Sequence, residues 1–244
     1  MRSGCMPELT PKVLVMIPTF NERGSIAPLV DAILALSIPG LGIIVVDDES
    51  PDGTAELVTD LARTRPALSL LRREPPAGRG LAGRDGFLYA LKHGASYLVE
   101  MDGDLSHQPR YIPALLAAMG SCDMAVGSRL APGGRDAERP ASRRWLTVIA
   151  GAYARLLLGV PVADPNSGFR CFSRKALEAI EPATLRSKGP AIIHETLYRA
   201  TRAGLRLHEV PIDFTDRKTG ASKLGLLRLA MGWLAILKLR LTGR

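Results

Sequence analysis

The stretch GIIVVDDESPDGT, residues 42–54, joins an apolar run to a group of acidic residues and then to a threonine. An apolar run without polar alternation is typical of a strand that is buried on both faces of a sheet. Thr54 is a residue type that begins helices, and the segment from Thr54 to Arg63 predicts one. The stretch therefore predicts a strand, an acidic loop and a helix, in that order.

The same order recurs along the chain. Between the apolar runs lie helix-periodic segments, such as Ser25 to Leu36, and further helices are predicted near 145–158 and 192–203. This alternation predicts an α/β fold with a mostly parallel central sheet flanked by helices, and no repeat or linker divides it. The expected strands are 13–17, 42–46, 68–71, 97–101 and 124–127.

Composition narrows the cellular setting. Of the 244 residues, 46% are hydrophobic, which is enough for a sizeable core. Cys5, Cys122 and Cys171 are far apart and form no C-x-x-C pair, so neither a disulfide framework nor a thiolate zinc site is expected. The first residues lack the apolar stretch of a secretory signal, and we therefore expect a cytoplasmic protein.

The net charge of +8 favours a partner that carries phosphate. Nucleic acid, anionic lipid and phosphorylated small molecules all fit that charge. Aromatic residues make up only 5% of the chain, and the basic residues do not cluster around stacking rings, which argues against nucleic acid. The net charge thus predicts a partner that carries phosphate but does not identify the class of that partner.

Acidic residues follow several predicted strands, at the edge where α/β proteins bind ligands. A helix cap needs only one acid, so capping does not explain the pair Asp102 and Asp104. Two such carboxylates suit Mg²⁺ or Mn²⁺, which take oxygen ligands and leave positions for substrate phosphates. Zinc is disfavoured because only His107 is nearby. The pattern predicts transfer of a group from a nucleoside diphosphate, with the cation stabilising the departing phosphate.

The segment GRGLAG, residues 78–83, matches the G-x-G-x-x-G fingerprint of dinucleotide-binding proteins. That fingerprint requires a tight turn directly after a strand, whereas the residues RREPPA with two prolines intervene here. We therefore expect no dinucleotide site. The glycines predict a flexible loop that brings Arg79 and Arg84 near a phosphate.

The end of the chain, residues 226–244, is apolar but carries Arg228, Lys238 and Arg240. Its longest uncharged window, Leu229 to Leu237, is far shorter than the roughly 20 residues of a spanning helix. Two interpretations remain open: a helix at a membrane surface, or a helix docked on the protein's own core.

Six motifs follow one another along the chain: IPTFNE (17–22), VVDDESPDGT (45–54), EMDGDLSHQP (100–109), GSR (127–129), DPNSGFR (164–170) and DRKTGASK (216–223). In this order they resemble the dolichyl-phosphate mannosyltransferase (polyprenol-phosphate mannose synthase) branch of glycosyltransferase family 2. The resemblance covers Val13 to Lys223, nearly the whole chain. It implies a GT-A catalytic domain over 1–225, a divalent metal ion, and inverting transfer of mannose from GDP-mannose to a polyprenyl phosphate.

The resemblance also assigns roles to individual residues. Asp102 and Asp104, with Gly103 between them, correspond to the metal and diphosphate site, and with Arg129 they are the expected catalytic residues. Arg129 also corresponds to a position near the acceptor phosphate. The remaining positions implied by the family are Pro18, Phe20, Glu22, Asp47, Arg217 and Lys223 for the nucleotide sugar, and Ser167 and Arg170 for the acceptor phosphate.

The sequence departs from the family at several positions. Phe20 replaces a more usual tyrosine, and Gly103 replaces the usual alanine. Ser106 stands where some members have a metal-binding glutamine, which removes the basis for a third protein ligand. The segment GRGLAGRDG differs from the common GLG-x-A form.

The resemblance implies an enzyme that is peripheral on the cytoplasmic face of a membrane, with a membrane-anchoring partner as an option. An acceptor phosphate is already ionised, so no side chain is needed to remove its proton. Two alternatives remain: a polyprenyl-phosphate glucosyltransferase that uses UDP-glucose, and a basic module without enzymatic activity that binds nucleic acid or membrane.

Overall fold

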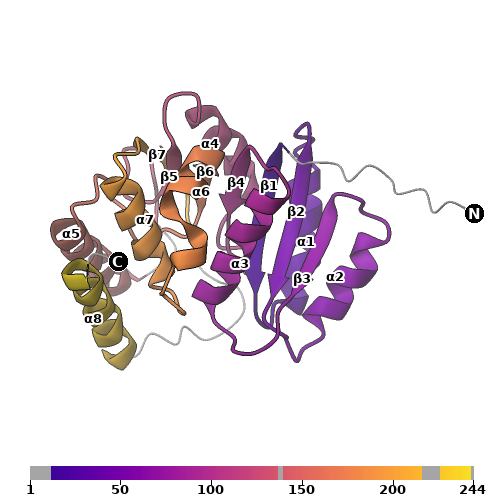
Figure 1. Ribbon diagram of the computed structural model, residues 1–244, viewed down its shortest axis with the longest axis horizontal. Helices are drawn as coiled ribbons and strands as arrows, with labels where there is room; N and C mark the ends of the chain where they lie inside the picture. The colour runs from indigo at the N-terminus through magenta and orange to yellow at the C-terminus, as the bar shows by residue number, and fades with distance from the viewer. Residues whose placement is uncertain (1–11, 137–139, 216–225, 243–244) are drawn as a thin grey trace, which may run out of the picture.

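The computed structural model describes residues 12–136, 140–215 and 226–242. In this part of the chain, a seven-stranded sheet carries helices on both faces (Figure 1). The strands are β1 (Val13–Thr19), β2 (Leu41–Asp47), β3 (Leu68–Arg72), β4 (Tyr97–Glu100), β5 (Met124–Ser128), β6 (Arg170–Ser173) and β7 (Leu207–Pro211). The helices are α1 (Arg23–Leu34), α2 (Thr54–Ala62), α3 (Arg79–Lys92), α4 (Ile112–Ala118), α5 (Ala141–Leu158), α6 (Arg174–Ile180), α7 (Ile192–Arg202) and α8 (Leu226–Thr242), with short 3₁₀ turns η1 (Pro109–Tyr111) and η2 (Pro182–Thr184).

The strand order is β3-β2-β1-β4-β6-β5-β7. β1 pairs in parallel with β2 and β4, and β5 pairs in parallel with β7. β6 is antiparallel to both of its neighbours, so β4 and β5 run in the same direction. The carboxyl ends of β1, β2, β4 and β5 therefore meet at one edge, and the prediction of a mostly parallel sheet is confirmed.

Two hydrophobic clusters explain why the strand sequences are apolar without alternation. On one face, Val15 and Ile17 of β1 pack with residues of α1, α2 and α4. On the other face, Leu14 and Met16 pack with residues of α3 and α5 to α8. Because both faces of β1 are covered, apolar residues occupy every position from Val13 to Pro18.

The prediction of a flexible loop at GRGLAG is wrong, since α3 begins at Arg79 and includes Gly80 and Gly83, with Gly78 as its N-cap. A Cβ atom at Gly80 would overlap the carbonyl oxygen of Ser187, and one at Gly86 would overlap the side chain of Met16. The glycines are there because the helix lies against backbone and against the sheet, and not because the segment must bend. β6 and β7 were not predicted as strands.

The C-terminal helix α8 lies beside α5 at one end of the molecule (Figure 1). Tyr153 of α5 stacks on Trp233 of α8, and its hydroxyl donates to the Trp233 carbonyl. Ile236 and Leu239 are buried in the same cluster as α7. One face of α8 is therefore docked on the core, as one of the two interpretations predicted.

Candidate functional site

The loop that follows β4 carries the first predicted site residues. The backbone N–H of Asp102 donates to Nδ1 of His107 at 3.0 Å, so the proton of the neutral ring lies on Nε2. Burial lowers the pKa of His107, against the opposing effect of Asp102 and Asp104. The Phe214 ring packs edge-on against His107 and lies under the guanidinium of Arg129, so the loop of the two aspartates and the arginine are neighbours. The structure thus brings together the three expected catalytic residues.

Asp104 is held by the residue two positions further on. The backbone N–H and the hydroxyl of Ser106 both donate to Oδ1 of Asp104, at 3.1 and 2.6 Å. Leu105 between them has a φ of 64°, which this tight turn requires. Ser106 was not expected to bind the metal ion. It instead orients Asp104, which was predicted to be a metal ligand.

Gly103 lies where the loop approaches the end of β1. A Cβ atom at this position would be 3.2 Å from Cγ2 of Thr19 and 3.4 Å from Cγ of Glu22. A side chain here would have to displace these groups by a few tenths of an ångström. The glycine therefore brings the predicted metal loop close to the predicted nucleotide-contacting segment.

Four residues predicted to contact the nucleotide lie at the ends of β1 and β2. Phe20 is 54% exposed and offers a ring face to a ligand, and Pro18 is partly exposed beside it. Glu22 accepts a hydrogen bond from Ser25 at 2.9 Å. Asp47 is fully buried and accepts bonds from the Ser50 hydroxyl and from Thr19. Asp47 therefore stabilises the loop that follows β2 through its bonds to Ser50, whereas Phe20, at the end of β1, is exposed.

Arg129 lies after β5, with its side chain almost fully buried. Its guanidinium makes two bonds to the carboxylate of Asp164, at 2.7 and 2.8 Å, and stacks over Phe214. Asp164 was not predicted as a site residue, although it opens the DPNSGFR motif. The signal that could have found it is that Asp164 is the one acidic residue of that motif, which follows the predicted phosphate-binding arginine along the chain.

The expectation that Arg170 contacts an acceptor phosphate needs correction. Its side chain is fully buried, and it pairs with Glu100 and donates to Thr196. Ser167 is also buried, and its hydroxyl accepts from the backbone of Phe169 at 3.3 Å. Both side chains are buried, and they stabilise the loop 164–168 from inside the protein. Arg217 and Lys223 lie outside the described residues.

Arg79 was predicted to approach a phosphate from a flexible loop, but it lies in the first turn of α3 and pairs with two carboxylates. One nitrogen of its guanidinium donates to Glu100 at 2.7 Å, and another donates to Asp102 at 3.0 Å. Although burial opposes it, Arg170 and Arg79 hold the pKa of Glu100 below its usual range. An arginine at the start of α3 thus touches the predicted metal-binding acid.

The residues present fit a divalent cation that is shared with a substrate. Asp102 and Asp104 offer hard oxygen ligands, which Mg²⁺ and Mn²⁺ prefer. Over the ranges that the structure describes, no group of three or more His, Cys, Asp or Glu side chains could form a closed metal site. A cation held by two carboxylates keeps further positions for phosphate oxygens, as Mg²⁺ does in phosphoryl-handling sites.

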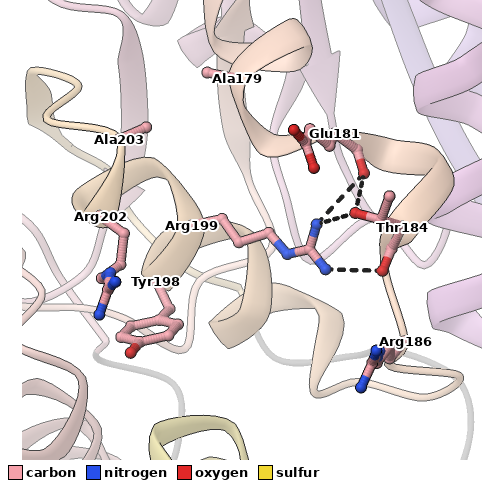
Figure 2. A pocket seen from close by; sticks show the side chains of 8 residues that line it. All are labelled: Ala179, Glu181, Thr184, Arg186, Tyr198, Arg199, Arg202 and Ala203. Carbon is pink, nitrogen blue, oxygen red and sulfur yellow. Dashed lines mark hydrogen bonds between the residues drawn. The ribbon is translucent and has the colours of Figure 1, made fainter. Parts of the chain in front are cut away.

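A cavity of about 650 Å³ lies between α6, η2 and α7 (Figure 2). Arg199 projects into it, and its guanidinium donates to the backbone of Glu181 and Thr184 and to the Glu195 carboxylate. None of the residues that line the cavity is a predicted site residue. Arg199 therefore links η2 to α7. The cavity is separate from the site formed by Asp102, Asp104 and Arg129.

Residues 14–181 match the family model described as Glycosyl transferase family 2. The chain is 38% identical over 213 residues to the undecaprenyl-phosphate mannosyltransferase of Micrococcus luteus, covering 87% of each chain. It is 41% identical over 217 residues to the polyprenol monophosphomannose synthase of Mycolicibacterium smegmatis, covering 88% of this chain and 82% of that one.

Solved structures share the fold. Glucosyl-3-phosphoglycerate synthase from Mycobacterium tuberculosis, in complex with Mn²⁺, UDP and glucosyl-3-phosphoglycerate, superposes with a TM-score of 0.67 at 21% identity, over 98% of this chain and 85% of that one. Mannosyl-3-phosphoglycerate synthase from Rubrobacter xylanophilus gives a TM-score of 0.64 at 17% identity, over 97% and 77%. These neighbours are glycosyltransferases of the GT-A fold, which confirms the predicted fold.

Proposed function

Because the chain belongs to glycosyl transferase family 2 and is a glycosyltransferase, we propose that it transfers mannose from GDP-mannose to a polyprenyl phosphate, with inversion at the sugar carbon. The observation that carries the proposal is the 38% and 41% identity to relatives named for mannosyl transfer to polyprenyl phosphate, over most of each chain. The family assignment sets aside the alternative of a basic module without enzymatic activity.

The proposal is supported by the loop of Asp102 and Asp104, which is bonded to His107, and by Arg129, which reaches the same ring through Phe214. Asp102 and Asp104 would hold a Mg²⁺ or Mn²⁺ ion, which would supply positive charge to stabilise the departing diphosphate. Phe20, exposed at the end of β1, offers a face for the nucleobase, and Pro18 and Glu22 lie beside it. Gly103 keeps that segment close to the aspartates. Donor base and diphosphate thereby have adjacent places in this site.

The acceptor half of the reaction needs positioning more than proton transfer. A phosphate monoester is ionised at neutral pH and can attack the sugar carbon directly, so the protein must hold two anions in line and offset their repulsion. Arg129, whose guanidinium is oriented by Asp164, is proposed for that role. Arg217 and Lys223 are proposed to assist, on the strength of the DRKTGASK motif.

The surface of α5 and α8 supports a membrane location for the acceptor. None of the helices in the described part of the chain has the length and hydropathy needed to cross a bilayer. Instead, large apolar side chains are exposed on these two adjacent helices, with Arg155, Lys238 and Arg240 also at the surface. We define this apolar face by Trp145, Val148, Ile149 and Leu156 of α5 with Trp233, Leu234, Leu237 and Leu241 of α8.

An apolar face with basic residues fits the boundary between head groups and acyl chains of anionic lipids. The polyprenyl tail of the acceptor resides in that layer, so a peripheral enzyme could receive the phosphate without leaving the surface. We propose that residues 226–244 contribute to this contact on the cytoplasmic face, while residues 1–225 form the catalytic domain.

Product formation tests the proposal. Purified protein is incubated with GDP-mannose or UDP-glucose, with polyprenyl phosphate or polyprenol, and with Mn²⁺ or EDTA, and lipid products are identified by mass spectrometry. We expect a mannosyl phospholipid only with GDP-mannose, polyprenyl phosphate and Mn²⁺. A glucosyl product from UDP-glucose would replace the donor assignment, and full activity in EDTA would refute the metal requirement.

Thermal shift offers an independent check of the donor. A ligand that binds only the folded state raises the melting temperature, by an amount that grows with the logarithm of its concentration relative to Kd. GDP with Mn²⁺ should stabilise the protein more than UDP with Mn²⁺ or GDP alone. Equal shifts for the two nucleotides would contradict the choice of GDP.

A further inference from the structure

A row of four alternating charges runs from the core to the predicted metal loop. It consists of Arg170, Glu100, Arg79 and Asp102, joined by ion pairs. The first two side chains are fully buried, whereas 21% of Arg79 and 30% of Asp102 is exposed. One guanidinium, that of Arg79, therefore connects an acid of the core to an acid of the site.

The backbone on both sides of Arg79 is fixed. The N–H of Gly78 donates to a carboxylate oxygen of Asp48 at 2.7 Å, and the N–H of Gly80 donates to the carbonyl of Lys188 at 3.0 Å. These bonds set where α3 begins, before any ligand is present. The planar fork of the arginine can then meet two carboxylates at once, which a lysine ammonium cannot do with the same geometry.

The loop of the DPNSGFR motif rests on the same pair. A Cβ atom at Gly168 would lie 3.1 Å from Nη2 of Arg79 and 3.6 Å from both carboxylate oxygens of Asp102. The backbone of this loop therefore packs directly on the Arg79–Asp102 contact. Asp164, which holds Arg129, is four residues before Gly168 in the same loop. A change in the orientation of the Arg79–Asp102 ion pair would therefore also shift the loop that carries Asp164.

Charge balance gives a reason for an arginine here. Glu100, Asp102 and Asp104 are three carboxylates within five residues of sequence, and Glu100 is fully buried. Like charges so close raise the cost of ionising each one. Arg170 and Arg79 offset two of the three negative charges, so Asp102 can remain an ionised ligand in a partly buried place.

We propose that Arg79 is the positioning residue of Asp102, holding one carboxylate oxygen so that the group is oriented for a divalent cation before the donor binds. The inference rests on the proposed function, because it assumes that Asp102 is a metal ligand. Hydrogen bonds to ligating carboxylates commonly change metal affinity by about 10- to 100-fold, since a ligand that is already oriented loses less freedom on binding.

Two variants separate positioning from the cost of an unpaired buried charge. Arg79→Lys keeps the positive charge but loses the two-pronged contact. Arg79→Met with Glu100→Gln removes one charge of each sign, and it is compared with Glu100→Gln alone, in which Arg170 likewise loses its counter-charge but Arg79 still contacts Asp102. Arg174→Met is the control, because Arg174 is exposed and its ion pair with Glu178 lies within α6. Circular dichroism and melting temperature establish that each variant is folded.

Mn²⁺ binding is measured directly by electron paramagnetic resonance of the free ion, with GDP present. We expect both Arg79 variants to bind Mn²⁺ about tenfold or more weakly, and Arg174→Met to bind like the wild type. In the transfer assay, the Mn²⁺ concentration for half-maximal rate should rise equally, and saturating Mn²⁺ should restore most of kcat. A purely structural role would lower the rate at every Mn²⁺ concentration.

Unchanged Mn²⁺ affinity in both folded Arg79 variants would overturn the inference, as would a loss of activity that excess Mn²⁺ does not rescue. Failure of the proposed function would look different, because the wild-type protein itself would then bind no Mn²⁺ with GDP. The binding measurement on the wild type thus distinguishes the two failures.

Discussion

Arg129 and Asp164 form a bidentate ion pair in which the arginine's own backbone N–H donates to the same carboxylate, at 3.2 Å. The pair is almost entirely buried, and Phe214 covers the guanidinium. Asp164 is held in turn, because its backbone N–H and that of Ala163 donate to Glu209 of β7. The orientation of a proposed phosphate-binding arginine is therefore decided by residues from two distant segments.

Replacing Asp164 by Asn should destabilise the protein through this pair. Removing one partner of a buried ion pair typically costs about 3 to 5 kcal/mol, since the other charge stays buried. We expect a decrease of about 3 kcal/mol in the free energy of unfolding, measured by urea denaturation. Asp60→Asn breaks the exposed pair with Arg63 and should cost less than about 1 kcal/mol. Equal costs for the two variants would contradict the structural account.

Asp104→Ala should abolish metal-dependent sugar transfer while the fold persists. Loss of a direct ligand should reduce the rate at least as much as loss of an outer-shell partner, which means about 100-fold or more. The stabilisation of the protein by GDP with Mn²⁺ should disappear in the same variant, as read by thermal shift. Full activity in a folded Asp104→Ala protein would refute the assignment of the site.

His194 should make stability depend on pH. Burial, and then the charge of Arg170, lower its pKa to about 4, and its ring bonds to Asn166 at 3.1 Å. An unfolded histidine titrates near 6.5, so between these values the unfolded chain binds one more proton and stability rises with pH. Stability is therefore lost as the pH falls from about 6.5 towards 4, by up to about 3 kcal/mol.

The variant His194→Gln keeps an amide donor for Asn166 but does not titrate. Its free energy of unfolding should change less between pH 6.5 and 4 than that of the wild type. His208→Gln serves as the control, because His208 is exposed. The account fails if both variants show the same pH dependence as the wild type.

Gly80→Ala should be destabilising even though alanine is the better helix former. The added Cβ overlaps the carbonyl oxygen of Ser187, and overpacking of this kind costs about 1 to 3 kcal/mol. Gly24→Ala in α1 is the matched control, because a Cβ there meets no atom within 4 Å. That variant should be neutral or more stable by up to about 1 kcal/mol. Thermal denaturation should therefore show a lower melting temperature for Gly80→Ala, and an unchanged or higher one for Gly24→Ala.

Changes on the apolar face of α5 and α8 should weaken binding to liposomes. Leu234 is 63% exposed and Leu156 is 85% exposed. Each leucine lost from a lipid contact should reduce affinity about tenfold, so Leu234→Glu and Leu156→Glu should both sediment less with anionic vesicles. Leu88→Glu on α3 is the control, since that exposed leucine lies outside the face. Equal loss in all three variants would mean that charge alone, and not the face, decides binding.

The five predicted strands are all present, because burial on both faces of the sheet gives each of them an apolar run. β6 and β7 were missed because polar or charged residues interrupt their apolar runs. Arg170 lies in β6 and faces Glu100 across the strand pair. Pattern alone would exclude a charged residue from a buried strand, and only the pairing partner accounts for it.

The start of helix α3 was predicted to be a flexible loop. Its glycines lower helix propensity, so the sequence predicted a loop, yet the lack of Cβ atoms lets the helix approach the backbone of residues 187–189 and the side chain of Met16. The gain from close packing outweighs the local cost. A segment distant in sequence decided this conformation, so no local pattern could predict it.

The sequence by itself determined the layered sheet and the placement of Asp102, Asp104 and Arg129 at its edge, because burial imposes apolar runs and chain direction brings strand ends together. Tertiary structure alone decided which charges meet. Arg129 is paired with Asp164, Arg170 with Glu100, and Arg79 with both Glu100 and Asp102. These partners are 21 to 70 residues apart in sequence. Charged side chains so far apart form ion pairs only when folding of the core brings them together and excludes water.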